Sequence, residues 1–223
     1  MMYMHPYYRN TEPTTSWTMK VSGRGIVKGE PDQATVTLGF QNKDMSLKQA
    51  QEKNNQVIQA IIDALTRLGV APEQIQTSEY RIFPDYDYKE GEQVFTGYQV
   101  NNILTLTLDD LSMIGAVIDT ATSNGANLVR DVTFSIQDID AYYNAALQQA
   151  LQQAVSKAQT IAQSLQVNLN AVPIRIIEST AAEQPIPFAK SSMVLAAESS
   201  PTPIEKGQLT IEANIVATYQ YFN

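Results

Sequence analysis

Two segments near the start of the chain alternate apolar and polar residues. Within a predicted strand at 32–42, every second residue from Ala34 to Phe40 is apolar, the period of a strand with one buried face. Residues 18–28 alternate in the same way, but Gly23 and Gly25 occupy two positions of the apolar face. Because glycine has no Cβ, these positions allow another backbone to approach closely. The intervening Gly-Glu-Pro-Asp at 29–32 favours a turn, so the sequence predicts two adjacent antiparallel strands.

Two longer segments repeat apolar residues every three or four positions, which is the period of an amphipathic helix. The first covers about 46–68, with a Ser46/Gln49 capping box at its start and Gly69 after its end. The second covers about 140–166 and is rich in alanine on its apolar side and in glutamine on its polar side. The side chains that we expect to be deeply buried are Ile61, Leu65, Leu147, Leu151 and Ile161.

Shorter patterns complete the predicted fold. Strands are predicted at 75–82, 95–108, 128–136, 172–177 and 209–221, with a short helix at about 110–123. The sequence therefore predicts the α+β class, with long, mostly antiparallel sheets packed against two main helices and one short helix. The predicted organisation is a mobile arm at 1–16 and one domain at 17–223 that contains a long loop at 178–207.

Composition narrows the possible partners and chemistry. A net charge of −8 and a pI near 4.6 argue against nucleic acid and anionic membrane as partners. No apolar run is long enough to span a bilayer. The absence of cysteine excludes disulfides, thiol catalysis and thiolate metal sites. The first ten residues lack a basic start followed by an apolar core, so we expect no signal peptide and a cytoplasmic location.

No recognisable catalytic group emerges from the remaining residues. His5 is the only histidine, which excludes a histidine-based triad or a multi-histidine metal site within one chain. Ser46, Ser78 and Ser135 do not lie in a nucleophile elbow. We therefore expect a protein that is not an enzyme and that binds no cofactor.

The segment at 80–98 is the one place where acidic and aromatic residues gather. Its carboxylates, Asp85, Asp87, Glu90 and Glu92, are of the type that hard cations such as Ca²⁺ prefer. Their spacing does not match an EF-hand loop, and charged hairpin tips are usually solvated, so we expect no metal there. The neighbouring tyrosines favour cross-strand packing over a ligand platform: Tyr80, Tyr86, Tyr88 and Tyr98. A small-molecule or metal-binding role for this hairpin is the alternative hypothesis.

The end of the chain favours self-association. The predicted strand at 209–221 is long and apolar on one face, and an unprotected edge of that kind invites pairing with another chain. The loop at 178–207 carries apolar residues that need a surface to cover. We therefore predict a homo-oligomer whose interface candidates are Phe188, Met193, Leu195, Val216 and Phe222.

Five segments, taken in order, resemble one protein family over nearly the whole chain. They are residues 21–40 (VSGRGIVKGEPDQATVTLGF), 74–80 (QIQTSEY), 97–104 (GYQVNNIL), 119–128 (DTATSNGANL) and 207–213 (GQLTIEA). Each motif is weak alone, but their order is similar to that of the SIMPL-domain family, bacterial proteins with no settled molecular activity.

The resemblance implies a fold and a role. It implies long sheets backed by two helices, homo-oligomerisation, frequent export and an association with envelope or oxidative stress. The family includes periplasmic immunogenic proteins and carries no established catalytic residues. The resulting hypothesis is a non-enzymatic, self-associating interaction or structural protein linked to the envelope or to a stress response.

Overall fold

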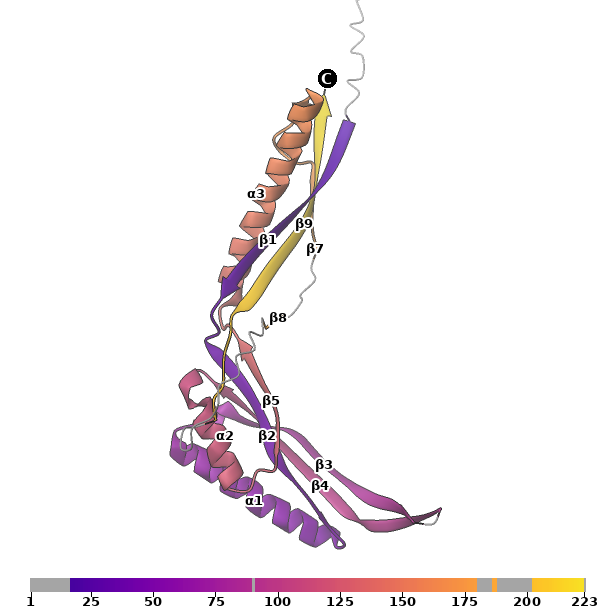
Figure 1. Ribbon diagram of the computed structural model, residues 1–223, viewed down its shortest axis with the longest axis vertical. Helices are drawn as coiled ribbons and strands as arrows, with labels where there is room; N and C mark the ends of the chain where they lie inside the picture. The colour runs from indigo at the N-terminus through magenta and orange to yellow at the C-terminus, as the bar shows by residue number, and fades with distance from the viewer. Residues whose placement is uncertain (1–16, 90, 180–185, 188–201, 223) are drawn as a thin grey trace, which may run out of the picture. The chain divides into compact units, whose positions relative to one another are not determined.

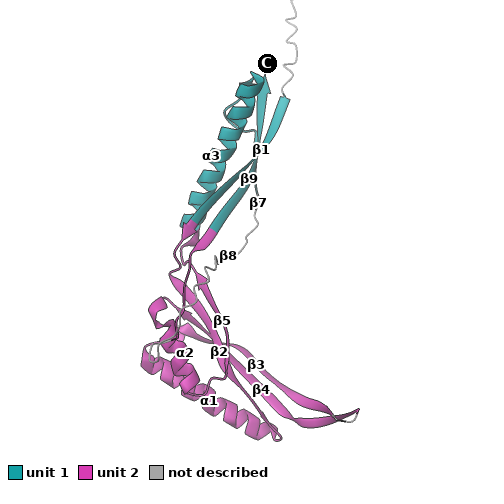
Figure 2. Ribbon diagram, viewed as in Figure 1, with its two compact units in different colours: residues 1–27, 140–184, 211–223 teal, residues 28–139, 185–210 magenta. Residues whose placement is uncertain are grey.

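The computed structural model describes residues 17–89, 91–179, 186–187 and 202–222. The chain forms two compact units, coloured separately in Figure 2. Unit 1 contains residues 1–27, 140–184 and 211–223, and unit 2 contains residues 28–139 and 185–210. The predicted mobile arm at 1–16 lies outside the described residues.

In unit 1, a long helix packs on a sheet built around the last strand (Figure 1). The helix is α3 (Ile139–Leu165), and strand β1 (Trp17–Gly29) lies beside strand β9 (Leu209–Phe222). On its other side β9 pairs with β6 (Asn168–Leu169) and β7 (Arg175–Ser179). The first two residues of β9 belong to unit 2, where they pair with β8 (Ile186–Pro187). From Leu209 to Tyr219, every residue of β9 at an odd-numbered position is buried, as the alternation predicts.

The two strand glycines allow β1 to lie directly on α3, as the sequence predicts. A Cβ added to Gly23 would lie 1.9 Å from the carbonyl oxygen of Ala150, and one added to Gly25 would lie 1.8 Å from that of Ala146. On the helix side, five buried alanines spaced four apart face the sheet: Ala146, Ala150, Ala154, Ala158 and Ala162. The small residues of both elements therefore form a single backbone-to-backbone contact within the chain.

This close contact corrects three of the predicted core residues. Leu147 and Leu151 are only partly buried, and Ile161 is 38% exposed. Because only alanine fits between α3 and the glycines of β1, the larger side chains of the helix lie at the margins of the contact. The other two predictions, Ile61 and Leu65, are confirmed, since both are fully buried in unit 2.

Unit 2 is a four-stranded antiparallel sheet with the order β3-β4-β2-β5. Its strands are β2 (Gln33–Asp44), β3 (Ile75–Lys89), β4 (Glu92–Leu108) and β5 (Leu128–Ser135). Helices α1 (Leu47–Leu68) and α2 (Ile114–Ser123) pack on one face of this sheet. Short 3₁₀ turns at Pro72–Gln74 and Leu111–Met113 precede β3 and α2.

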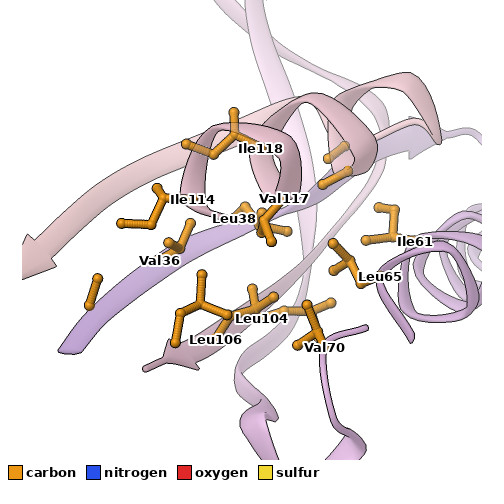
Figure 3. Packing of buried hydrophobic residues seen from close by; sticks show 14 of the residues in the cluster. Val36, Leu38, Ile61, Leu65, Val70, Leu104, Leu106, Ile114, Val117 and Ile118 are labelled. Atoms are coloured by element: carbon orange, nitrogen blue, oxygen red, sulfur yellow. The ribbon is translucent and has the colours of Figure 1, made fainter. Parts of the chain in front are cut away.

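The core of unit 2 lies between the helices and the sheet, as Figure 3 shows. Its larger buried side chains are Val36, Leu38, Leu104 and Leu106 of the sheet, Ile61 and Leu65 of α1, and Ile114, Val117 and Ile118 of α2. Burying one such side chain stabilises the fold by about 1.5–3 kcal/mol relative to leaving it exposed. Ser46 accepts a hydrogen bond from the Gln49 N–H and Gly69 adopts φ 111°, so the N-cap and the C-terminal glycine of α1 are present. The second bond of the predicted capping box is replaced, because the Ser46 N–H donates to Asp44 Oδ1 at 2.8 Å instead of to the Gln49 side chain.

One polar side chain is buried in the same interface. Asn54 of α1 is fully buried, and its Nδ2 donates to the carbonyl oxygens of Phe40 and Val100 and to Oδ1 of Asn42. These bonds tie the helix to β2 and β4 at a fixed register, because no apolar residue could satisfy the same acceptors.

The predicted α+β class is confirmed. One difference concerns the expected charged tip at 85–92, where β3 instead runs to Lys89 and β4 starts at Glu92. In the part of the chain that the structure describes, no helix is both long and apolar enough to cross a membrane.

Candidate interaction surface on the β3–β4 hairpin

The β3–β4 hairpin is longer than the sheet to which it belongs. The pairing of β2 with β4 stops at Asp44 opposite Tyr98, whereas β3 and β4 remain paired out to Lys89 and Glu92. Beyond Tyr98 the hairpin is therefore a two-stranded ribbon, and Figure 1 shows its tip extending away from the helices of unit 2. A two-stranded ribbon is marginally stable in water unless side chains or a partner cover it.

Aromatic rings stabilise this ribbon from one face. Phe95 makes edge-to-face contacts with Tyr86 at 5.6 Å and with Tyr98 at 5.1 Å between ring centroids. A bulge at this point inserts Thr96 into β4, which places Phe95 on the same face as Tyr98. Gly97 adopts φ 131° in the bulge, a backbone conformation that favours glycine. The predicted cross-strand packing is thus seen for Tyr86, whereas Tyr98 contacts Phe95 within the same strand, β4.

Most of this face is open to solvent. By alternation along β3 and the ring contacts, six large side chains share one face with Pro84 and are called here the hairpin aromatic face: Tyr80, Ile82, Tyr86, Tyr88, Phe95 and Tyr98. The exposed fraction is 46% for Tyr86 and 73% for Tyr88, and Tyr80 and Ile82 are also exposed. Contiguous exposed apolar side chains of this kind mark interaction sites.

A polar contact holds the root of the ribbon on its opposite side. The Lys43 Nζ donates to Asp85 Oδ2 at 2.6 Å and to Thr96 Oγ1 at 2.6 Å. The hydrogen bond from the Lys43 ammonium lowers the pKa of the Asp85 carboxyl below its ordinary value. The contact joins β2 to both strands of the ribbon and keeps Asp85 ionised.

The four candidate metal ligands are placed as follows. Asp85 is paired with Lys43, Asp87 accepts a hydrogen bond from the Tyr88 N–H at 2.9 Å, and Glu92 lies opposite Lys89. Glu90 lies outside the described residues. Within the described ranges, no three acidic or histidine side chains gather as a set of metal ligands.

A shallow polar hollow of about 250 Å³ lies beside the ribbon root. It is lined by Gln41, Asn42, Lys43, Gln99, Asn127 and Leu128. Much of its polar lining is already bonded, since Asn127 pairs through both amide atoms with the backbone of Gln41 and Lys43 pairs with Asp85. Nothing in the described part of the chain supports the alternative small-molecule role for the hairpin.

The predicted oligomer contacts on the last strand need one correction. The expectation of an unprotected edge there is wrong, because β9 has strand neighbours on both sides. Val216 pairs with Ile177 and Phe222 pairs with Asn168, and both predicted residues are partly buried. The other candidates, Phe188, Met193 and Leu195, lie outside the described residues.

The open edge of unit 2 was not predicted. Strand β3 is an outermost strand of its sheet and carries four residues of the hairpin aromatic face. The alternation of Tyr80, Ile82, Pro84, Tyr86 and Tyr88 at every second position was the signal that could have revealed it. The five charged residues among positions 85–92 are typical of a solvated loop, which is why this part of the strand was not predicted.

Comparison with known proteins gives the chain a family and relatives. The family model described as "SIMPL: Protein of unknown function (DUF541)" matches residues 19–219. The "26 kDa periplasmic immunogenic protein" of Brucella melitensis is 26% identical over 219 residues, which cover 95% of this chain and 87% of that protein. The protein of the same name from Brucella abortus is equally similar. The "Uncharacterized protein YggE" of Escherichia coli is 27% identical over 125 residues, or 56% of this chain and 51% of that protein.

The comparison overturns one prediction and confirms another. The expectation of a cytoplasmic location is contradicted, because the two Brucella relatives that align with almost the whole chain are named periplasmic. The expectation rested on the first ten residues alone. The matched region runs from the first strand to near the end of the last, as the resemblance indicates. The chain belongs to the SIMPL (DUF541) family of proteins of unknown function.

Proposed function

We propose that this protein is a non-enzymatic interaction protein of the bacterial envelope, that it assembles with copies of itself, and that the hairpin aromatic face is the contact. The names of the Brucella relatives support a periplasmic location. A link to a stress response belongs to the same hypothesis and rests on the family resemblance.

The observation that carries the proposal is the exposure of the hairpin aromatic face. Tyr86 and Tyr88 are 46% and 73% exposed on a ribbon that neither helix of unit 2 covers in Figure 1. Tyrosine is enriched at protein interfaces because it has a large apolar ring and a hydroxyl that can bond at the rim. Covering these rings removes apolar surface from water and stabilises a ribbon that has few other contacts.

The edge position of β3 favours a second copy as the partner. Its outer N–H and C=O groups can pair with the same strand of another subunit, and the aromatic side chains of the two β3 strands then contact each other as cross-strand neighbours. A two-fold contact of this kind is self-complementary, because each residue meets its counterpart around one axis. It needs no residue from the segments outside the described ranges.

Sedimentation velocity on the full chain and two lysine variants tests the proposal. Tyr86→Lys places a charge within the aromatic face, whereas Val172→Lys makes the same charge change at a position that is 70% exposed in unit 1. We expect particles larger than the 24.7 kDa monomer for the wild type and for Val172→Lys, and dissociation for Tyr86→Lys. A wild type that stays monomeric at micromolar concentrations contradicts self-association. Equal assembly of the two variants contradicts the role of the hairpin.

A further inference from the structure

The exposed edge of strand β1 is closed by side chains of α3 rather than by another strand. Gln149 Oε1 accepts a hydrogen bond from the Ile26 N–H at 3.2 Å, and Gln153 Oε1 accepts one from the Arg24 N–H at 2.9 Å. One turn further along, the Lys157 Nζ donates to the carbonyl oxygen of Ser22 at 2.8 Å. Within the described ranges β9 is the only strand that pairs with β1, so these bonds occupy its free edge.

The spacing of the three bonds follows from the geometry of the two elements. Four residues of an α-helix rise about 6.0 Å, and two residues of an antiparallel strand rise about 6.8 Å. Each step of four along α3 therefore matches a step of two along β1, in the opposite chain direction. The same register places position 161 of the helix beside Lys20 and position 165 beside Thr18.

The row of polar side chains stops at those two positions. They are Ile161 and Leu165, which cannot bond to a backbone group, and their exposed fractions are 38% and 60%. Since the N–H and C=O groups of every second residue of β1 face this edge, those of Lys20 point the same way as those of Ser22 and Arg24. Among the described residues, no side chain of α3 reaches the backbone of Lys20.

A groove lies where the row ends. Its volume is about 400 Å³, and its lining is Lys20, Val21, Ser22, Ser156, Lys157, Thr160 and Ile161. Two of these residues are cationic and none is acidic, although the whole chain carries a net charge of −8. The groove therefore combines an uncapped strand edge, an apolar wall on α3 and a local positive charge.

We propose that this groove binds an extended segment of a partner protein in which apolar residues alternate with acidic ones. The segment adds to β1 at residues 18–20, where its backbone pairs with the uncapped groups of Lys20. Side chains of a strand alternate between two sides, so its apolar residues contact Ile161 and Leu165 while its carboxylates lie beside the Lys20 ammonium. The neighbouring Arg24 is already paired with Glu212 at 2.5 Å, which leaves Lys20 as the cation of that face nearest the incoming strand. This contact is separate from the hairpin aromatic face and does not depend on it.

A fluorescein-labelled peptide of sequence Glu-Val-Glu-Val-Glu-Val-Glu tests the proposal by anisotropy with the full chain. The decisive variant is Ile161→Gln, which continues the row of capping side chains and closes the edge at Lys20. Val155→Gln is the matched control, because Val155 is 37% exposed on the same helix but lies outside the row of four-residue steps. Both substitutions replace a β-branched residue by a better helix former, so both variants should fold.

We expect the peptide to bind the wild type and Val155→Gln with dissociation constants that agree within about twofold, the usual effect of a surface substitution. Ile161→Gln should raise the dissociation constant at least about tenfold, because the peptide loses a neutral backbone hydrogen bond to Lys20 and the apolar contact with Ile161. A peptide methylated on the backbone nitrogens that face β1 should bind the wild type as weakly as the unmethylated peptide binds Ile161→Gln. The proposal is overturned if the wild type does not bind the peptide, if Ile161→Gln binds as well as Val155→Gln, or if the methylated peptide binds equally.

Discussion

Substitution of Gly25 by alanine should separate β1 from α3 and destabilise unit 1. The added Cβ would lie 1.8 Å from the Ala146 carbonyl oxygen and 2.8 Å from the Ala150 nitrogen. An ordinary carbon–oxygen contact is about 3.3–3.6 Å, so the two backbones must move apart by about 1.5 Å. Since the obstructing atoms belong to the backbone of a helix, no change of side-chain rotamer can relieve the clash.

The expected loss of stability is about 2–5 kcal/mol. Overpacking alone costs about 1–3 kcal/mol when a core relaxes well, and here a strand must move as a unit. The same movement weakens the bonds of Gln149 and Gln153 to β1, each with a net contribution of about 1 kcal/mol. Replacing glycine also reduces the entropy of the unfolded chain, which stabilises by only about 0.4–1 kcal/mol and is therefore outweighed.

Thermal unfolding followed by circular dichroism measures the effect. At about 2–4 °C per kcal/mol for a chain of this size, Gly25→Ala should lower the Tm by about 4–20 °C. Ser22→Ala is the control, because it lies on the same strand with its side chain exposed. Adding Ala146→Gly to Gly25→Ala should not restore stability, because the clash is with the carbonyl of residue 146 and not with its methyl group. A Tm for Gly25→Ala within about 2 °C of Ser22→Ala would refute the close contact.

Three further predictions concern unit 2. Leu104→Ala should cost about 2–5 kcal/mol in urea unfolding, because the side chain is fully buried, and a cost below about 1 kcal/mol would show a core that collapses around the cavity. Asn54→Asp should be less stable than Asn54→Ala at neutral pH, because a buried carboxylate would face two carbonyl oxygens that accept hydrogen bonds from the Asn54 amide in the wild type. If chemical denaturation gives the reverse order of stability, this hydrogen-bond network is excluded. Hydrogen bonding from Lys43 lowers the pKa of Asp85 in the folded protein. The ion pair therefore makes its full contribution to stability at pH values above the ordinary carboxyl pKa of about 3.9, and this contribution is lost as the pH falls through the lower pKa of the folded state. An NMR titration should place the Asp85 midpoint below that value and shift it upward in Lys43→Met, whereas an unchanged midpoint in the variant would argue against the pair.

Local patterns in the sequence predict much of this fold. The alternation around Gly23 and Gly25 indicates both the buried face of β1 and the close approach of another backbone, and the structure confirms both. The caps of α1 are also predictable, because Ser46 and Gly69 act on neighbouring residues in the sequence. Such features depend on contacts over a few positions, which a single sequence contains.

Features that depend on distant pairing were not predictable. The central position of β9 arises because β1 and β7, more than a hundred residues apart in the chain, pair on opposite sides of it. The exposure of Ile161 follows from the alanine contact, which decides which side of the apolar stripe of α3 faces the sheet. The row of Gln149 and Gln153 bonds to β1 likewise needs a strand and a helix to be placed side by side.

The candidate site was predicted only in part. The cross-strand packing predicted for the hairpin tyrosines is seen at Tyr86, which contacts Phe95 of the neighbouring strand, whereas Tyr98 contacts Phe95 within its own strand. The sequence did not indicate that β3 and β4 extend beyond the four-stranded sheet, because the pairing of β2 with β4 ends at Asp44, where the chain leaves β2 to begin α1. Residues 85–92, where a charged loop was expected, therefore belong mostly to the two strands that carry the exposed hairpin aromatic face.

A spin label at position 88 tests the central claim, self-association through the hairpin, most directly. The natural chain has no cysteine, so Tyr88→Cys provides a single labelling site at the exposed end of the hairpin aromatic face. Val172→Cys provides the matched site in unit 1. Dipolar electron spin resonance on the full chain should show a short distance between labels at position 88 of two subunits, and this signal should disappear on dilution with unlabelled protein. A dipolar signal that is absent at position 88, or that is no shorter than the one from position 172, would contradict the account.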